Sequence, residues 1–136
     1  MTLPFKLYLV VLAGSALGGL ARYVVSGLVG AQFGETFPWG TVIVNVSGCF
    51  VIGFFAGLTA PDGRLFIGAA TRQFVLTGLC GGYTTFSSFS LQTINLMNEG
   101  DWVRAGGNVA GSVVMCLFAT WLGTLAAAAV NQLKGA

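Results

Sequence analysis

The chain consists of long apolar stretches separated by short polar links. Most charged residues lie in the links, together with Pro38, Pro61 and the pair Asp62–Gly63. A helix of roughly 20 apolar residues crosses the 30 Å hydrocarbon core of a bilayer. The pattern therefore predicts helices at approximately 4–30, 40–60, 66–98 and 105–131, within a single transmembrane domain that spans residues 1–136.

The first apolar stretch has two interpretations. Lys6 followed by LYLVVLAGSALGG is similar to a secretory signal, with a basic start, an apolar middle and small residues near a cleavage point. The helix interpretation is favoured because the apolar sequence continues past Arg22 through 23–29. An arginine towards one helix end can extend its side chain to the membrane interface. We therefore predict an all-α membrane protein with four transmembrane helices.

Composition narrows the function. The chain is 55% hydrophobic and 7% charged, against about 25% charged in soluble domains, which excludes a soluble globule. It has no histidine, and its four carboxylates fall in the links, so general bases and proton relays are missing from the predicted spans. We expect no enzyme. Six scattered basic residues do not form a phosphate-binding stripe, so we expect no nucleic-acid partner.

The basic residues also bear on orientation in the membrane. If both termini lie on one side, Lys6, Arg64, Arg72 and Lys134 lie there, and Arg22 and Arg104 lie on the other. Orientation follows the lysine and arginine bias of short loops, and this bias is weak. Insertion in both orientations would allow an antiparallel homodimer from one gene product.

Glycine is abundant, at 21 of 136 residues, and four pairs have the spacing that lets membrane helices approach closely. These pairs are Gly14/Gly18, Gly53/Gly57, Gly78/Gly82 and Gly107/Gly111. They predict a tightly packed bundle with little interior, so a pore fits best at a subunit interface. The three cysteines, Cys49, Cys80 and Cys116, lie in the predicted spans without zinc-site spacing and are interpreted as buried small hydrophobic residues.

The third stretch contains the segment TGLCGGYTTFSSFS at 77–90. Paired glycines and threonines are poor helix formers, so we predict a break near 81–85. Non-helical backbone at membrane depth must be buried in protein or line a wet cavity, and broken helices often direct freed backbone groups at ions. A continuous glycine-rich helix with packing hydroxyls is the alternative.

Several uncharged polar residues lie near this segment or at similar depth. Phe86 and Phe89 share one helical face, and Thr85, Ser88 and Gln92 share a neighbouring one. In the second stretch, Asn45 follows Thr41 and needs a polar partner, either a neighbouring helix or a permeating ion. In the fourth stretch, polar side chains form a row at every fourth position: Asn108, Ser112, Cys116, Thr120 and Thr124. We expect the first members of this row either to line one wall of a pathway or to form hydrogen bonds with other helices.

The chemistry of these groups favours an anion or a neutral solute. Hydroxyl and amide hydrogens can solvate an anion, as can the positive edges of aromatic rings. A cation would prefer carbonyl or carboxylate oxygens, and no carboxylate lies within the spans. Composition does not identify the solute further.

Four motifs occur in order along nearly the whole chain: GGLARY at 18–23, GTVIVN at 40–45, GLCGGYTTFSSFS at 78–90 and AGSVVM at 110–115. Together they resemble the Fluc (CrcB) family of small bacterial fluoride channels. The resemblance implies an antiparallel, dual-topology homodimer in the bacterial inner membrane, with the lipid bilayer around it. Its two pores would pass fluoride passively out of the cytoplasm and protect the cell from fluoride.

The resemblance also implies roles for individual residues. Asn45 matches the pore asparagine, and Phe86 and Phe89 match the phenylalanines whose ring edges face fluoride. The carbonyls of Gly81 and Thr84, two from each subunit, would hold a structural Na+ that is not transported. Other polar positions of the family's pathway match Thr85, Ser87, Ser88 and Ser112, and we add Thr41 to this set. The arginine of the family's first-helix motif matches Arg22.

Three positions depart from the family pattern. Gln92 replaces a glutamate of many relatives, Cys116 replaces a threonine, and Arg104 aligns with a tyrosine. Two rival functions are weaker. A small multidrug-type exporter would need a membrane-embedded glutamate, and a structural membrane subunit would not need hydroxyls and ring edges at a helix break.

Overall fold

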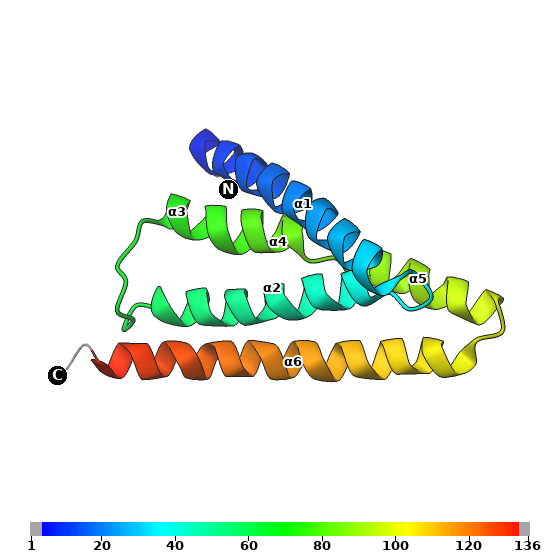
Figure 1. Cartoon of the computed structure of the whole chain (residues 1–136). Helices are drawn as coiled ribbons and strands as arrows, with labels where there is room; N and C mark the ends of the chain where they lie inside the picture. Colours follow the sequence, from blue (N-terminus) through cyan, green and yellow to red (C-terminus); the bar gives the residue numbers. More distant parts are fainter. Residues whose placement is uncertain (1–3, 134–136) are drawn as a thin grey trace.

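The computed structural model describes residues 4–133, and all of its regular elements are helical (Figure 1). In chain order they are α1 (Phe5–Phe33), α2 (Trp39–Leu58), α3 (Ala69–Gln73), the π-helix η1 (Phe74–Cys80), α4 (Gly81–Tyr83), α5 (Phe86–Asn98) and α6 (Trp102–Gln132). Three of them, α1, α2 and α6, are long and apolar enough to cross a membrane. The prediction of an all-helical protein is confirmed.

The third apolar stretch differs in detail from its prediction. Its helical part begins at Ala69 instead of 66, because 65–68 form no regular structure and the Leu65 amide bonds to the Leu58 carbonyl. Gly81 and Gly82 stay helical, although their low helix propensity suggested a break there. The non-helical residues are Thr84 and Thr85, with ψ angles of 159° and 114°. A π-helical turn, with its wider backbone, precedes this interruption.

Helices α2 and α6 lie side by side and run in the same direction (Figure 1). A Cβ added at Gly53 would overlap the Thr120 carbonyl oxygen, and one at Gly123 would overlap the Phe50 carbonyl oxygen. At Gly57 an added Cβ would lie 2.6 Å from the Ala127 methyl carbon. The backbones are therefore almost in contact, which is how small residues allow membrane helices to associate.

Helix α1 packs in the same way against η1 and α4. An added Cβ at Gly14 would lie 2.5 Å from the Phe74 carbonyl oxygen, and one at Gly82 would lie 2.6 Å from the Ser15 carbonyl oxygen. The fourth glycine pair behaves differently. Apart from the backbone of α6 itself, no described atom lies within 4 Å of an added Cβ at Gly107 or Gly111, so this pair does not pack against another described element of its own chain.

Candidate functional site: two cavities that meet at a helix interruption

The extended backbone at Thr84–Thr85 is held by a side chain from α2. The Thr85 amide donates to Asn45 Oδ1 at 2.7 Å, and Asn45 Nδ2 donates to the Thr85 carbonyl at 3.0 Å. The Asn45 amide therefore satisfies both backbone groups of Thr85. Its NH2 group carries a second proton, which remains available to a ligand.

Thr85 also begins α5. Its hydroxyl oxygen accepts from the Ser88 amide at 3.1 Å, which is an N-cap interaction. The Ser87 hydroxyl lies 3.3 Å from the Thr85 hydroxyl. Ser87 itself is exposed and lines neither cavity described below.

Because of these bonds, two backbone carbonyls lose their usual helical donors. In a continuous helix the Thr85 amide would bond to the Gly81 carbonyl, and the Ser88 amide to the Thr84 carbonyl. Here Asn45 and the Thr85 hydroxyl accept those two amides instead. Backbone carbonyl oxygens are suitable ligands for a hard cation, so Gly81 and Thr84 have the chemistry expected of the predicted sodium ligands.

One side of the interruption opens on a cavity of about 320 Å³, which we call the narrow cavity. Phe89 is buried in its wall with 8% exposure, whereas Phe86 is 76% exposed. The two rings are tilted by 48°, with centroids 5.3 Å apart. No charged residue is among the described residues that line it: Asn45, Gly48, Cys49, Ile52, Cys80, Gly81, Thr84, Thr85, Phe86, Phe89, Ser112, Val113 and Cys116.

A buried hydrogen-bond network supports the α6 wall of the narrow cavity. Asn108, which is 1% exposed, donates to the Thr93 hydroxyl at 3.0 Å, and Thr93 donates to the Phe89 carbonyl at 2.7 Å. Ser112 donates to Asn108 Oδ1 at 3.1 Å. The Ser112 hydroxyl must therefore rotate before it can donate to a solute in the cavity.

The polar row of α6 divides at this point. Ser112 and Cys116 line the narrow cavity. The hydroxyl groups of Thr120 and Thr124 instead donate to carbonyls of their own helix, at 3.0 Å and 2.6 Å. For these two threonines, bonding within the helix is the better interpretation.

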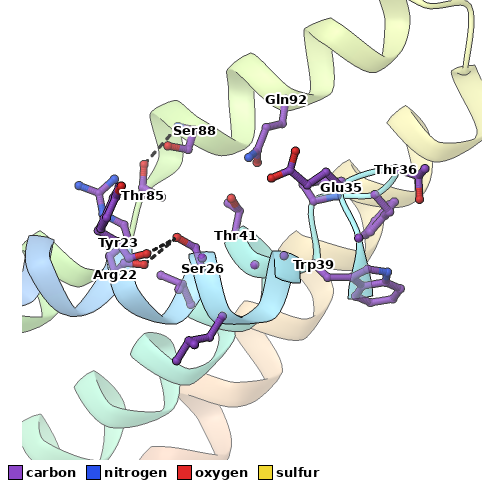
Figure 2. Close-up of a pocket in the computed structure, with 18 of the residues that line it drawn as sticks. Arg22, Tyr23, Ser26, Glu35, Thr36, Trp39, Thr41, Thr85, Ser88 and Gln92 are labelled. Atoms are coloured by element: carbon purple, nitrogen blue, oxygen red, sulfur yellow. Dashed lines mark hydrogen bonds between the residues drawn. The ribbon is translucent and has the colours of Figure 1, made fainter. Parts of the chain in front are cut away.

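A larger cavity, of about 950 Å³, lies on the other side of Thr85, among α1, α2, α5 and the link that joins α1 to α2 (Figure 2). We call it the wide cavity. Of the residues proposed from sequence, Arg22, Thr41, Ser88 and Gln92 line it, and Thr85 belongs to both cavities. The spacing in α5 thus separates two surfaces, with the rings on the narrow cavity and the polar groups on the wide one.

The wide cavity contains charge and unsatisfied polar atoms. Arg22 Nε and Gln92 Oε1 are buried and have no hydrogen-bond partner among the described residues. Figure 2 shows Gln92 pointing into the cavity, towards Glu35 of the link. Arg22 lies in the wall of the wide cavity, eleven residues before α1 ends at Phe33. Its location at the membrane interface stays a prediction.

Sequence patterns did not identify several cavity residues. Glu35, Asn95 and Glu99 line the wide cavity, but each lies in or beside a polar link, where a solvated side chain is the ordinary expectation. The sequence also did not identify Thr93, because the importance of its hydroxyl depends on the hydrogen bond with the buried Asn108. Only the three-dimensional packing of α5 on α6 brings these two together.

The chain is similar to known proteins over almost its whole length. The family model described as "CrcB-like protein, Camphor Resistance (CrcB)" matches residues 9–124, a range that contains every site residue named above. The chain is 62% identical over 130 residues to a fluoride-specific ion channel FluC from Opitutus terrae, covering 96% of this chain and 98% of the relative. Identity is 61% over 129 residues (95% and 98%) to the Methylocella silvestris FluC, and 55% over 125 residues (92% and 97%) to that of Rhodospirillum rubrum.

Proposed function

The chain belongs to the CrcB-like family, and on this premise we propose that it is a fluoride-specific ion channel of the bacterial inner membrane. A channel of this kind is not an enzyme. The observation that carries the proposal is the interruption at Thr84–Thr85, which Asn45 holds between a wide cavity containing Arg22 and an uncharged narrow cavity.

The two cavities suggest how a small anion would pass. The Arg22 guanidinium attracts anions to the part of the wide cavity that it lines, although the carboxylates of Glu35 and Glu99 also line this cavity. Beyond Thr85, the free proton of the Asn45 amide, the hydroxyls and the ring edges of Phe86 and Phe89 replace water around the ion. Because no charged side chain is among the described residues that line the narrow cavity, the ion is bound weakly enough to leave. A membrane potential that is negative inside would drive fluoride outwards and relieve its toxicity.

The working unit in this proposal is an antiparallel homodimer inserted in both orientations. Each subunit would cross the membrane four times, with the segment from Ala69 to Asn98 as one broken span. Support comes from the surface of the single chain, on which Gly81 and Phe86 are exposed at the interruption. In a two-fold dimer the same patch contacts itself, so both interruptions would meet at the centre.

A structural sodium ion is the remaining part of the proposal. The carbonyls of Gly81 and Thr84, whose usual helical donors bond elsewhere, would hold it together with the same two carbonyls of a second subunit. Bound there, the ion supplies positive charge close to the anion paths and links the subunits. It is not transported.

A flux assay tests the main proposal. The purified protein is reconstituted in liposomes loaded with fluoride or chloride, and a potassium ionophore provides charge compensation. We expect rapid fluoride release and little chloride release, recorded with ion-selective electrodes. Equal release of the two anions would contradict fluoride selectivity.

A second assay tests the sodium ion. Sodium is replaced by a bulky organic cation throughout purification and reconstitution, and fluoride release is measured before and after sodium is restored. We expect impaired release that recovers with sodium, without sodium crossing the membrane. A sodium flux comparable to the fluoride flux would show that the ion is a transported species.

A further inference from the structure

The register between α2 and α6 brings two cysteines face to face. An added Cβ at Gly53 would overlap the Thr120 carbonyl, and the two helices run in the same direction. Cys49 lies four residues before Gly53, and Cys116 lies four residues before Thr120. Four residues are about one helical turn, so the two thiols occupy facing turns. A side-chain contact between Cys49 and Cys116 agrees with this register.

Both thiols belong to the narrow cavity. Cys49 and Cys116 are half-buried and form no disulfide with a described cysteine. They line the narrow cavity together with Asn45 and the two phenylalanines. Cys80 lines the same cavity but is buried on η1. The described residues contain no cluster of three or more cysteine, histidine or carboxylate ligands, so the closest grouping is a pair. Two ligands do not make a zinc site, which needs four.

We propose that Cys49 and Cys116 form a two-coordinate site for a soft metal cation, and that an ion bound there closes the narrow cavity to the transported anion. The closure depends on the proposed channel function, whereas the binding site does not. Thiolate sulfur selects soft cations, and the facing turns of α2 and α6 supply two sulfurs to one ion.

Mercuric ion is the most suitable probe because its charge of +2 balances the negative charges of the two thiolates. Binding forms two S–Hg bonds and breaks two S–H bonds, and both protons leave to the solvent. One Hg2+ with two thiolates is electrically neutral, so the complex avoids the cost of a net charge in a low-dielectric environment. A monovalent soft cation on two thiolates would leave a net negative charge in the path of the anion.

The binding experiment uses the full chain in detergent and HgCl2. In the Cys80→Ser variant, which keeps only the proposed pair, the intact mass is expected to increase by one mercury minus two protons, with no chloride retained. Adding Cys49→Ser or Cys116→Ser leaves a single thiol, and the adduct should then keep a chloride ligand. The pair should also need at least tenfold more free cysteine to release mercury, since its two sulfurs bind the ion as a chelate. A chloride-retaining adduct on the intact pair would overturn the site.

The flux experiment uses the same variants in fluoride-loaded liposomes, each compared with its own untreated rate. HgCl2 is expected to reduce fluoride release at least tenfold in the unmodified protein and in Cys80→Ser, and a dithiol should restore it. The Cys49→Ser and Cys116→Ser variants should be at least tenfold less sensitive. Mercury bound by the pair without loss of flux would overturn the closure. If the unmodified protein carries no fluoride, the channel function fails, and the mass measurement alone decides the site.

Serine could disturb an apolar helix contact, so Cys49→Ala and Cys116→Ala provide a second pair of variants without a new hydroxyl. They must show the same loss of the two-proton adduct. If they bind mercury as the intact pair does, Cys80 or another ligand is responsible and the assignment is wrong.

Discussion

The two cavities that meet at Thr85 differ in how their polar groups are satisfied. In the narrow cavity, Asn45 bonds to Thr85 and Ser112 bonds to Asn108. In the wide cavity, Arg22 Nε and Gln92 Oε1 are buried and have no hydrogen-bond partner within the part of the chain that the structure describes. Polar groups that form hydrogen bonds with one another keep a fixed geometry, whereas buried polar groups without a protein partner need a water molecule or an ion as their partner. The wide cavity is therefore suited to hydrated ions and the narrow cavity to selection.

The charges differ in the same direction. Arg22, Glu35 and Glu99 line the wide cavity, while the narrow cavity presents amide, hydroxyl, thiol and aromatic groups. A full charge acts over a Debye length of about 10 Å at 0.1 M salt, whereas dipoles act at contact. Substitutions in the two cavities should consequently change the fluoride flux by different amounts and with different salt dependence.

Asn45→Ala should have the largest effect. It leaves the Thr85 amide and carbonyl without their partner, and each buried unsatisfied group costs roughly 1–3 kcal/mol. Because 1.4 kcal/mol corresponds to a factor of ten, we expect fluoride release to fall by about 100-fold or more. Liposome flux measures this.

Asn98→Ala is the matched control, because Asn98 is exposed at the end of α5. It should keep its flux within about twofold, as expected of a surface change. If Asn45→Ala retained flux comparable to this control, Asn45 would not be needed to hold the interruption, and the satisfied geometry of the narrow cavity would have no functional role.

Phe86→Ile should have the next largest effect. It removes a ring edge from the narrow cavity while keeping an apolar side chain, and Phe86 is 76% exposed in the single chain. An aromatic edge is worth about 1 kcal/mol beyond its area, so we expect fluoride flux to fall by about fivefold to tenfold, with the elution volume on a sizing column unchanged. Phe66→Ile, in a link and 94% exposed, is the control. Equal flux in the two variants would remove the Phe86 ring from the pathway.

The sequence predicted those features of the fold that depend on residues close together in the chain. Long charge-free stretches indicated the helices, and the spacing of residues in α5 separated Phe86 and Phe89 from Ser88 and Gln92, which now line different cavities. The interruption was expected near 81–85 because glycine and threonine disfavour helix. It falls at Thr84–Thr85, since the Asn45 amide and the Thr85 cap satisfy the backbone there.

What the sequence did not predict depends on packing between distant segments. Asn45 and Thr85 are 40 residues apart, and periodicity left open whether the asparagine bonds to protein or to an ion. The location of Arg22 in the wide cavity depends on how α1 packs against α2. The spacing of the glycine pairs did not indicate that Gly107 and Gly111, unlike the others, pack against none of the residues 4–133 outside their own helix.

Arg22→Gln should have a smaller effect that depends on salt. It removes the positive charge from the wide cavity but leaves the narrow cavity unchanged. Charged clefts raise local ion concentration and entry rates, so we expect about threefold to tenfold lower fluoride flux at low ionic strength. The difference should shrink as salt screens the charge. Arg22→Lys keeps the charge and should keep most of the flux, and Arg64→Gln, exposed and outside both cavities, serves as the control. A loss independent of salt would mean that Arg22 acts by packing.

Asp101→Asn should have the smallest effect, because the Asp101–Arg104 ion pair, at 2.7 Å, lies at the start of α6 outside both cavities. Hydrogen bonds from the Arg104 amide and then from its side chain lower the pKa of Asp101 below its usual value. The resulting stabilisation is complete above the pKa of the unfolded chain and is lost only as pH falls through the lower folded value. Between pH 8 and 5 we therefore expect a small, constant decrease in melting temperature relative to the unmodified protein, and fluoride flux within about twofold. A flux change that matched that of Arg22→Gln would show that charge anywhere near this end of the bundle governs entry, and the distinction between the wide cavity and its surroundings would be lost.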